Sequence, residues 1–264
     1  MIRLFYVLMA GIIAALQGVA WADPINMPVG VTEISHAVYG LHMIIFTICV
    51  VIGVGVIAAI LYSVIMHRQS RRPEAAQFHE NTSIEIVWTL IPFLILVVMA
   101  VPAAGTLINI YDSSGSDMTI KVTGYQWKWG YDYIGEDFGF ISELDEQSRR
   151  ATLPGSSITP RQVENYLLEV DHPMVVPVGS KVRLLITSVD VIHSWWVPAL
   201  GMKKDAIPGV MNEMWFRIEE PGSYRGQCAE LCGAHHAFMP IVVEALPQDD
   251  YDAWLKEQKK NHAA

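Results

Sequence analysis

A short stretch near the carboxyl end of the 264-residue chain concentrates side chains that bind soft metal ions. It runs from Gly226 to Pro240 and reads GQCAELCGAHHAFMP. Its candidate ligands are two thiols, two adjacent imidazoles, a thioether and a carboxylate: Cys228, Cys232, His235, His236, Met239 and Glu230. Thiolate, thioether and imidazole together suit copper far better than they suit the hard cations that prefer oxygen. The stretch therefore predicts a redox copper site.

The order of these residues is typical of a copper-binding loop. An electron-transfer site with a single copper ion uses two His, one Cys and a weak axial Met. Because the Cys is doubled here, both sulfurs are candidates to bridge a pair of ions, each completed by one imidazole and one weaker ligand. The second imidazole has to come from outside the loop, and His193 is the best candidate because it follows a strand-like run, residues 181–189. Composition does not separate His235 from His236.

A disulfide is the alternative for Cys228 and Cys232, because paired cysteines on the oxidising side of a membrane ordinarily oxidise. The neighbouring His and Met residues favour the metal site. The third cysteine, Cys49, lies within an apolar run and is expected to be a small packing residue. The remaining histidines have no such companions and are expected to be surface or interfacial residues: His36, His42, His67, His79, His172 and His262.

Three sequence blocks resemble subunit II of bacterial, aa3-type haem-copper cytochrome c oxidase, and the likeness covers nearly everything after residue 35. The blocks are DVIHSW at 190–195, DAIPG at 205–209 and the GQCAELCGAHHAFMP stretch. The resemblance implies a dinuclear copper centre. Its bridging ligands would be Cys228 and Cys232, its terminal ligands His193 and His236, and its weak axial ligands Met239 and the carbonyl of Glu230. It also implies that the Glu230 side chain binds magnesium at the interface with subunit I.

The first half of the chain is organised around membrane spans. Residues 1–22 predict a cleaved signal peptide, with a third membrane helix as the alternative. After an outer segment, 23–42, the uncharged runs 43–66 and 86–111 are each long enough to cross a hydrocarbon core of about 30 Å. The connecting loop, 67–85, contains Arg68, Arg71 and Arg72, whereas residues 23–42 contain no Lys or Arg, so the loop is expected in the cytoplasm. This places the protein in the bacterial inner membrane, with its copper domain on the periplasmic side.

The rest of the chain predicts a β domain. Residues 112–248 contain short alternating runs, such as 118–124 and 181–187, separated by Gly and Pro as in a sandwich or barrel. The resemblance implies a cupredoxin-like Greek-key barrel, so the fold class is a membrane-anchored all-β protein with a two-helix hairpin. Residues 249–264 have helical composition and are expected to pack outside the barrel. No motif for a covalently attached haem is present in the sequence.

The most aromatic segment is 124–133, GYQWKWGYDY. Strand alternation predicts that its aromatic side chains share one face: Tyr125, Trp127, Trp129, Tyr131 and Tyr133. The resemblance implies that Trp127 lies over the copper centre, where electrons enter. Lys128 departs from the aromatic residue that is usual there in the family.

Charge points to a basic partner. From residue 112 onward the chain has 14 basic and 22 acidic residues, a net charge of −8. An acidic surface steers basic partners and raises their association rate, so cytochrome c is the expected donor. The expected docking carboxylates are Asp132, Glu136, Asp137 and Asp190. A merely solvated acidic face is the alternative, and Val189 stands where relatives often carry an acid. No nucleic-acid partner is expected.

The expected function follows from the resemblance. The subunit takes electrons from cytochrome c onto the copper pair and passes them to haem in subunit I, where oxygen is reduced to water; subunit III and the lipid bilayer are the other expected partners. Glu85, at the start of the second span, is interfacial by its position alone, and the resemblance implies that it lies near the mouth of a proton-uptake route. The alternative function is a membrane-anchored copper chaperone or redox assembly factor. A quinol oxidase subunit would lack the thiols.

Overall fold

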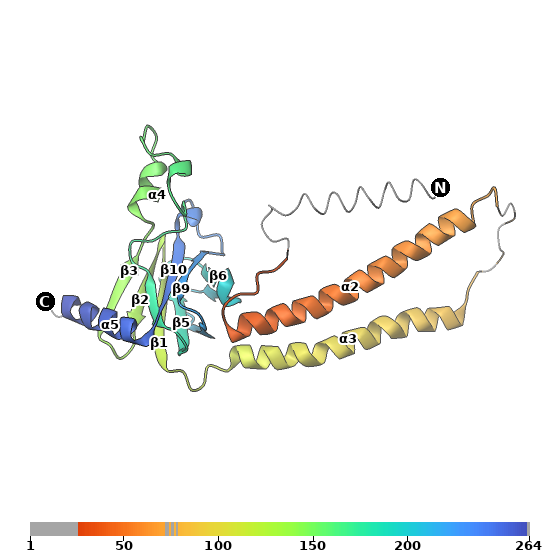
Figure 1. Cartoon of the computed structure of the whole chain (residues 1–264), viewed down its shortest axis with the longest axis horizontal. Coiled ribbons are helices and arrows are strands. Elements are labelled where there is room, and N and C mark those ends of the chain that lie inside the picture. The colour runs from red at the N-terminus through yellow and green to blue at the C-terminus, as the bar shows by residue number, and fades with distance from the viewer. Residues whose placement is uncertain (1–25, 72–73, 75–76, 78, 263–264) are drawn as a thin grey trace.

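The computed structural model describes residues 26–71, 74, 77 and 79–262, which form two long helices and one β domain (Figure 1). Helix α2 spans Glu33–Met66 and helix α3 spans Thr82–Tyr111. The two helices project from the same side of the β domain as a hairpin. The predicted signal peptide, residues 1–22, lies outside the described residues.

Both helices are long and apolar enough to cross a membrane. At about 1.5 Å per residue the 34 residues of α2 extend for about 51 Å, well beyond a hydrocarbon core of about 30 Å. Helix α2 starts at Glu33, ahead of the uncharged run predicted to begin at residue 43, because a capping box starts the helix. Thr32 Oγ1 accepts a hydrogen bond from Ser35 N, and Ser35 Oγ accepts one from Thr32 N. The added turns carry Ile34 and Ser35 into the β domain, where both are buried.

The β domain contains ten strands within the described residues. They are β1 (Met118–Tyr125), β2 (Lys128–Tyr133), β3 (Phe138–Ser142), β4 (Met174–Pro177), β5 (Lys181–Ser188), β6 (His193–Val197), β7 (Met202–Ala206), β8 (Asn212–Arg217), β9 (Gly222–Gln227) and β10 (Pro240–Leu246). One sheet has the order β3-β2-β1-β5-β8, a second has the order β4-β10-β9, and β6 and β7 form a separate ribbon. Strand pairs β1–β5 and β4–β10 are parallel and the others are antiparallel.

Strict alternation of burial places the core between these sheets. In β5, for example, Val182, Leu184 and Ile186 are fully buried while the residues between them are partly exposed. Sequence blocks far apart along the chain are thereby brought side by side, since β1 pairs with β5 and β9 with β10. The predicted fold, a helix hairpin followed by a cupredoxin-like β domain, is confirmed.

The predicted aromatic strand is broken by a turn. Strand β1 ends at Tyr125, which pairs with Lys128 at the start of β2, so Gln126 and Trp127 form the turn between them. The expectation of one continuous aromatic face is therefore wrong. Trp129 and the two tyrosines of β2 are buried, whereas Trp127 is only partly buried at the end of the barrel. The chain reverses direction at this end of the barrel. Side chains alternate between the two faces of the sheet only within each strand, so the alternation does not continue through the turn.

The β domain is fastened to the hairpin through backbone and side-chain hydrogen bonds. Thr32 forms a β-bridge with Ile218, and Val31 N donates to Ala199 O at 2.9 Å. From the other helix, Asn109 O accepts a bond of 3.0 Å from Trp215 Nε1. These bonds fix the position of the barrel relative to both helices.

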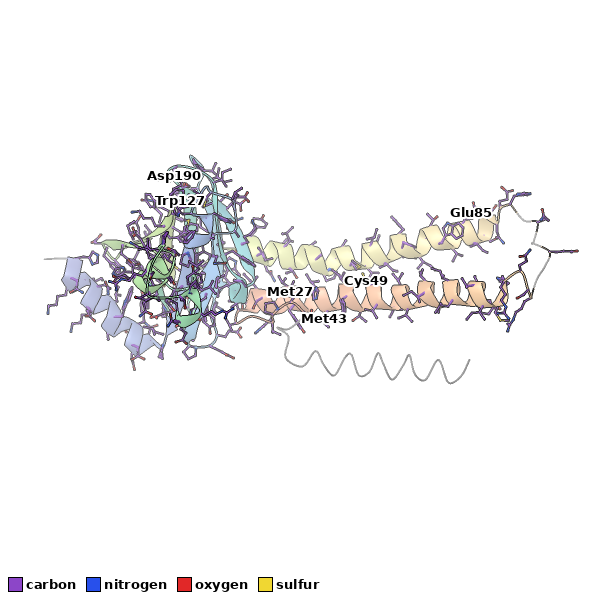
Figure 2. All side chains as sticks on the ribbon, turned by 90° about the horizontal axis from the view of Figure 1, so that it is seen from above. Met27, Met43, Cys49, Glu85, Trp127 and Asp190 are labelled. Atoms are coloured by element: carbon purple, nitrogen blue, oxygen red, sulfur yellow. The ribbon has the colours of Figure 1, made fainter. Side chains whose placement is uncertain are left out.

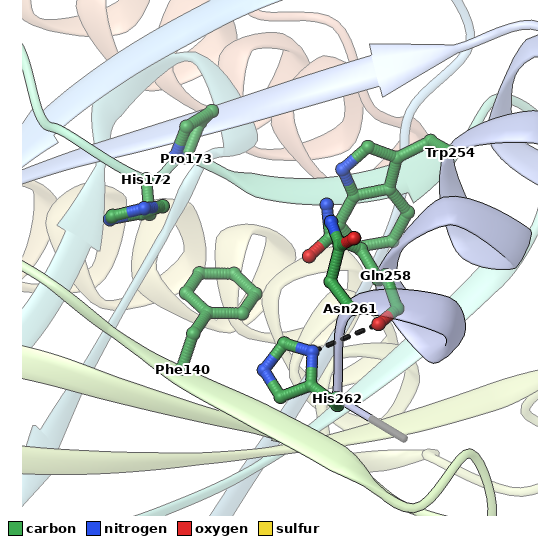
Figure 3. A pocket seen from close by; sticks show the side chains of 7 residues that line it. All are labelled: Phe140, His172, Pro173, Trp254, Gln258, Asn261 and His262. Carbon is green, nitrogen blue, oxygen red and sulfur yellow. Dashed lines mark hydrogen bonds between the residues drawn. The ribbon is translucent and has the colours of Figure 1, made fainter. Parts of the chain in front are cut away.

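The short helices lie outside the sheets. They are α4 (Glu146–Ala151), the 3-10 turns η1 (Pro160–Gln162), η2 (Pro198–Leu200) and η3 (His236–Phe238), and the carboxyl-terminal helix α5 (Gln248–His262). Helix α5 packs against the barrel from outside through Tyr251 and Trp254. Together with Phe140 and His172, its last turns line a cavity of about 290 Å³, and no predicted site residue lines that cavity (Figure 3).

Candidate metal centre

The predicted metal ligands come from β6 and from the loop that joins β9 to β10. His193 is the first residue of β6, and the loop runs from Cys228 to Met239. The loop is closed at its base by the hydrogen bond from Cys228 N to Met239 O, at 3.1 Å. It is attached to β6 by the bond from Ala229 N to Ser194 O, at 2.9 Å. The barrel therefore brings a histidine from one strand against a loop more than thirty residues further along the chain.

Four donor atoms converge where this loop meets β6. The two thiols are free, with Cys228 Sγ 3.8 Å from Cys232 Sγ. Each sulfur also faces one imidazole nitrogen: Cys228 Sγ lies 3.9 Å from His193 Nδ1, and Cys232 Sγ lies 3.4 Å from His236 Nδ1. Within the described part of the chain, His193 and the two cysteines form the one group of three whose ligand atoms all lie within 4.8 Å of one another.

The weaker ligands expected at this site lie close by. Met239 is almost fully buried, with 1% of its surface exposed, and Glu230 O lies 3.3 Å from Cys228 Sγ. The Glu230 side chain, in contrast, is exposed. This residue therefore presents its carbonyl to the thiols while its carboxylate remains available to a partner.

The two thiols differ in their tendency to ionise. Burial opposes the Cys228 thiolate, but hydrogen bonds from His193, from backbone N–H groups and from His236 outweigh burial and lower its pKa to about 7. Burial and the adjacent Cys228 thiolate raise the pKa of Cys232. Cys228 is thus the thiol that loses its proton more readily, and the Cys232 thiolate forms when a cation compensates its charge.

His193 is held in place on three sides. Its Nε2 lies 2.9 Å from Asp190 Oδ1, so the hydrogen-bonded imidazole presents Nδ1 to the thiols. The ring meets the Trp129 indole edge to face, with centroids 5.9 Å apart. Gly124 leaves room for the imidazole, because a Cβ at that position would lie 2.8 Å from His193 Cδ2. Burial disfavours the charged form of Asp190, but the bonds from His193 and from backbone N–H groups still hold the pKa of this carboxyl below its usual value.

The turn that carries Trp127 is bonded directly to the loop. Trp127 Nε1 donates to Cys232 O at 3.1 Å, and Gln126 Nε2 donates to the same oxygen at 2.8 Å. His235 packs against the Trp127 indole at a centroid distance of 4.6 Å. Sequence reasoning had left the role of His235 open and had not singled out Gln126. The sequence does offer one indication for Gln126, because this residue stands next to Trp127.

A groove runs beside the Trp127 indole. It encloses about 530 Å³, and its walls include His235 and Leu153. Lys128 lies 3.1 Å from Glu143 in the same groove. The hydrogen bond from Lys128 overcomes the effect of burial and lowers the pKa of Glu143. Lys128 therefore ties β2 to the segment that leads into α4.

The predicted docking carboxylates are not gathered at one place. Asp190 and Trp127 lie together on one side of the β domain (Figure 2). Glu136 and Asp137 lie in the turn after β2, at the opposite end of that strand from Trp127, and Glu136 forms an ion pair with Lys259 of α5. Asp132 lies on β2, with 54% of its side chain exposed.

Two predicted residues lie on the helices, away from the thiol site. Glu85 is in the first turn of α3, at the end of the hairpin farthest from the β domain (Figure 2). Cys49 is exposed on α2. Neither belongs to the group of soft donors.

The residues present suit copper. Two free thiols, two imidazoles with their Nδ1 atoms directed at sulfur, and a buried thioether form a soft donor set. The bond that the outer nitrogen of His193 donates to Asp190 is the type of support that metal-bound histidines ordinarily have.

Comparison with known proteins agrees with this chemistry. Residues 118–246 match the family model for the periplasmic domain of cytochrome c oxidase subunit II, and residues 20–104 match the model for its transmembrane domain. Cytochrome c oxidase subunit 2 of Cereibacter sphaeroides is 38% identical over 238 residues, covering 86% of this chain and 78% of the relative. The subunit 2 of Cyanidium caldarium is 38% identical, covering 86% and 88%. The crystal structure of the periplasmic domain of cytochrome oxidase subunit II from Bradyrhizobium japonicum is 39% identical, with a TM-score of 0.49, and covers 56% of this chain and 98% of that one.

The thiols provide the first test. Replacing Cys228 or Cys232 with Ser removes a soft ligand, so copper affinity should fall by more than about 100-fold, beyond the effect of losing an outer-shell partner. Affinity is measured by competition with a chelator on the full chain in detergent. Cys49→Ser, which alters a thiol outside the site, is the control and should bind copper like the wild type. Equal affinity in all three variants would exclude the thiols as ligands.

Proposed function

The chain belongs to the cytochrome c oxidase subunit II family, and from this premise we propose that its copper centre holds two ions and takes its electrons from a cytochrome c. The protein is the subunit through which electrons enter the oxidase, and its partner is the haem-bearing subunit I. Oxygen chemistry takes place in that partner. The convergence of two free thiols with two imidazole Nδ1 atoms is the observation that carries the proposal.

We assign each ligand a role from its position. Cys228 and Cys232 would be the bridging ligands, since each sulfur faces the other and one imidazole. The terminal ligands would be His193 and His236, and the weak axial ligands would be Met239 and Glu230 O. When bound, a copper pair bridged by thiolates supplies a one-electron carrier whose charge is shared by both ions.

The protein contributes burial and a fixed geometry. His193 is fully buried, and the two cysteines are 5% and 3% exposed, so water has little access to the donor atoms. The loop is closed at its base and bonded to β6, which limits its movement when charge changes. A site that moves little on oxidation and reduction has a low reorganisation barrier, which is what an electron relay requires.

Trp127 is the proposed electron port. It is partly buried in a turn at the barrel end, and its indole N–H bonds to the carbonyl of the bridging residue Cys232. One face of the turn therefore meets solvent while the other is hydrogen-bonded to the ligand loop. His236 is preferred to His235 as a ligand because His235 packs against the Trp127 indole, while His236 Nδ1 faces sulfur.

The donor is attracted by the field of the whole acidic domain. Its net charge of −8 favours a basic partner, and steering depends on the summed charge more than on one pair. The Asp132 side chain is 54% exposed, which makes it more accessible than the side chains of Asp190 and Glu136, at 29% and 33%. Glu136 and Asp137, at the far end of β2, contribute at longer range.

The remaining assignments concern the assembled oxidase. The exposed Glu230 carboxylate is proposed to bind magnesium at the interface with subunit I. The β domain is proposed to lie on the periplasmic side of the bacterial inner membrane, and subunit III is proposed as a further partner. Glu85, at the opposite end of α3, then lies at the cytoplasmic surface, where it is proposed to stand near the mouth of a proton route.

Copper content tests the proposed function directly. The full chain, purified in detergent and loaded with copper, should hold two ions per chain and give an EPR signal from one unpaired electron shared equally by two copper nuclei. Cys228→Ser should lose that signal. One ion per chain, or a signal from a single nucleus, would contradict a dinuclear centre.

The port is tested by removing the indole N–H. Trp127→Phe loses the bond to Cys232 O and should slow electron transfer from reduced cytochrome c by about one to two orders of magnitude, the scale of a misplaced reacting group. Copper content should not change. Trp196→Phe, at a tryptophan of β6 that is 40% exposed, is the matched control and should transfer electrons at the wild-type rate. Wild-type kinetics in Trp127→Phe would exclude this residue as the port.

Salt should weaken donor association. Raising ionic strength from about 0.01 M to 0.15 M shortens the Debye length from about 30 Å to about 8 Å. The association rate of cytochrome c should then fall by about tenfold or more, because steering by the acidic domain is screened. Stopped-flow kinetics measures this rate, with sucrose in place of salt as the control. A rate that does not depend on salt would argue against electrostatic docking.

A further inference from the structure

Asp190 contacts both the turn that carries Trp127 and the ligand His193. We propose that Asp190 is a positioning residue that holds the electron port and the copper ligand in one geometry, and that it does not act mainly as a docking charge. The inference rests on the proposed copper centre and on the Trp127 port. It gives Asp190 a role in electron transfer that its acidic character alone does not indicate.

The protein uses both oxygens of this carboxylate. Oδ2 accepts a bond of 2.7 Å from Gln126 N, within the turn. Oδ1 lies 2.9 Å from His193 Nε2 and accepts bonds from Val191 N at 2.7 Å and from Ser188 Oγ at 3.2 Å. One side chain thus joins the end of β5, the turn after β1 and the start of β6.

The turn is held from its other side by the ligand loop. Gln126 Nε2 and Trp127 Nε1 both donate to Cys232 O. The turn therefore lies between two anchors, Asp190 and the Cys232 carbonyl, and each anchor is bonded to, or belongs to, a proposed ligand. Loss of Asp190 would release Gln126 N and would leave the outer nitrogen of His193 without its acceptor.

The same contacts make Asp190 a poor docking charge. Only 29% of its side chain is exposed, and four protein donors already surround its oxygens. Asp132 differs on both points, since 54% of its side chain is exposed and its one ion pair, with Lys121, is long at 3.4 Å. A partner's ammonium group would therefore meet Asp132 more readily than Asp190.

Three single-residue variants separate the positioning role from the docking role. Asp190→Asn keeps the shape but places an amide N–H₂ against Gln126 N or His193 Nε2, whereas Asp132→Asn removes the same charge from an exposed site. Asp190→Glu keeps the charge but moves the carboxylate. Each variant is made in the full chain. Copper affinity and EPR are measured on the chain in detergent, and steady-state kinetics at several ionic strengths are measured in the assembled oxidase.

Loss of positioning should change both copper binding and the maximal turnover rate. We expect Asp190→Asn and Asp190→Glu each to lower copper affinity by about 10- to 100-fold, as loss of an outer-shell partner does, and to change the copper hyperfine pattern. Turnover at saturating cytochrome c should fall. Asp132→Asn should keep the wild-type affinity and spectrum, and should raise KM by no more than about fivefold, the size of one exposed ion pair.

A docking role predicts the reverse pattern. If Asp190→Asn keeps the wild-type spectrum and copper affinity and raises only KM, as Asp132→Asn does, or if Asp190→Glu behaves as wild type, the inference is wrong. Should Asp190→Asn not fold, as judged by circular dichroism, the charge-preserving Asp190→Glu decides by the same criteria. Failure of the proposed function would be seen separately, because the wild-type chain would then not bind two copper ions.

Discussion

The hydrogen bond from Ala229 N to Ser194 O holds two parts of the copper site together. It fastens the β9–β10 loop to β6 one residue beyond His193, so that a histidine far back in the chain reaches the Cys228 thiol. The loop alone offers one imidazole beside its two sulfurs, and β6 alone offers an imidazole without a sulfur. The four-donor site exists because the barrel sets β6 beside β9, and the loop between β9 and β10 then has to pass over the start of β6.

Around this site the same groups support the metal and the port. The Cys232 carbonyl accepts from the Trp127 indole while its sulfur faces His236. Asp190 orients His193 and also holds the backbone of the Trp127 turn. Trp129 packs on the His193 ring, so the two tryptophans of one hairpin serve different purposes. The buried metal ligands and the partly exposed Trp127 are thus separated only by the turn that carries Trp127.

The helix hairpin determines the position of the metal site relative to the membrane-spanning helices. The first turns of α2 extend beyond the length that a bilayer requires and bury Ile34 in the barrel. Asn109 of α3 accepts a bond from Trp215 of β8. Because the barrel is bonded to both helices, this chain by itself sets the distance and orientation of the copper loop relative to the membrane-spanning hairpin. A relay needs such a fixed distance to its acceptor.

The sequence alone determined the element types and the chemistry, because both depend on local properties. An uncharged run of 24 residues is long enough to span a membrane, and thiols beside His and Met suit copper. It also supplied His193 as a candidate and the cupredoxin-like fold. Only the tertiary structure decided that Trp127 lies in a turn instead of a strand, that α2 begins at Glu33, and that both oxygens of the Asp190 carboxylate meet donors of the protein. These features depend on contacts between strands distant in the chain, and no local pattern records which distant group a carboxylate or an indole N–H will meet.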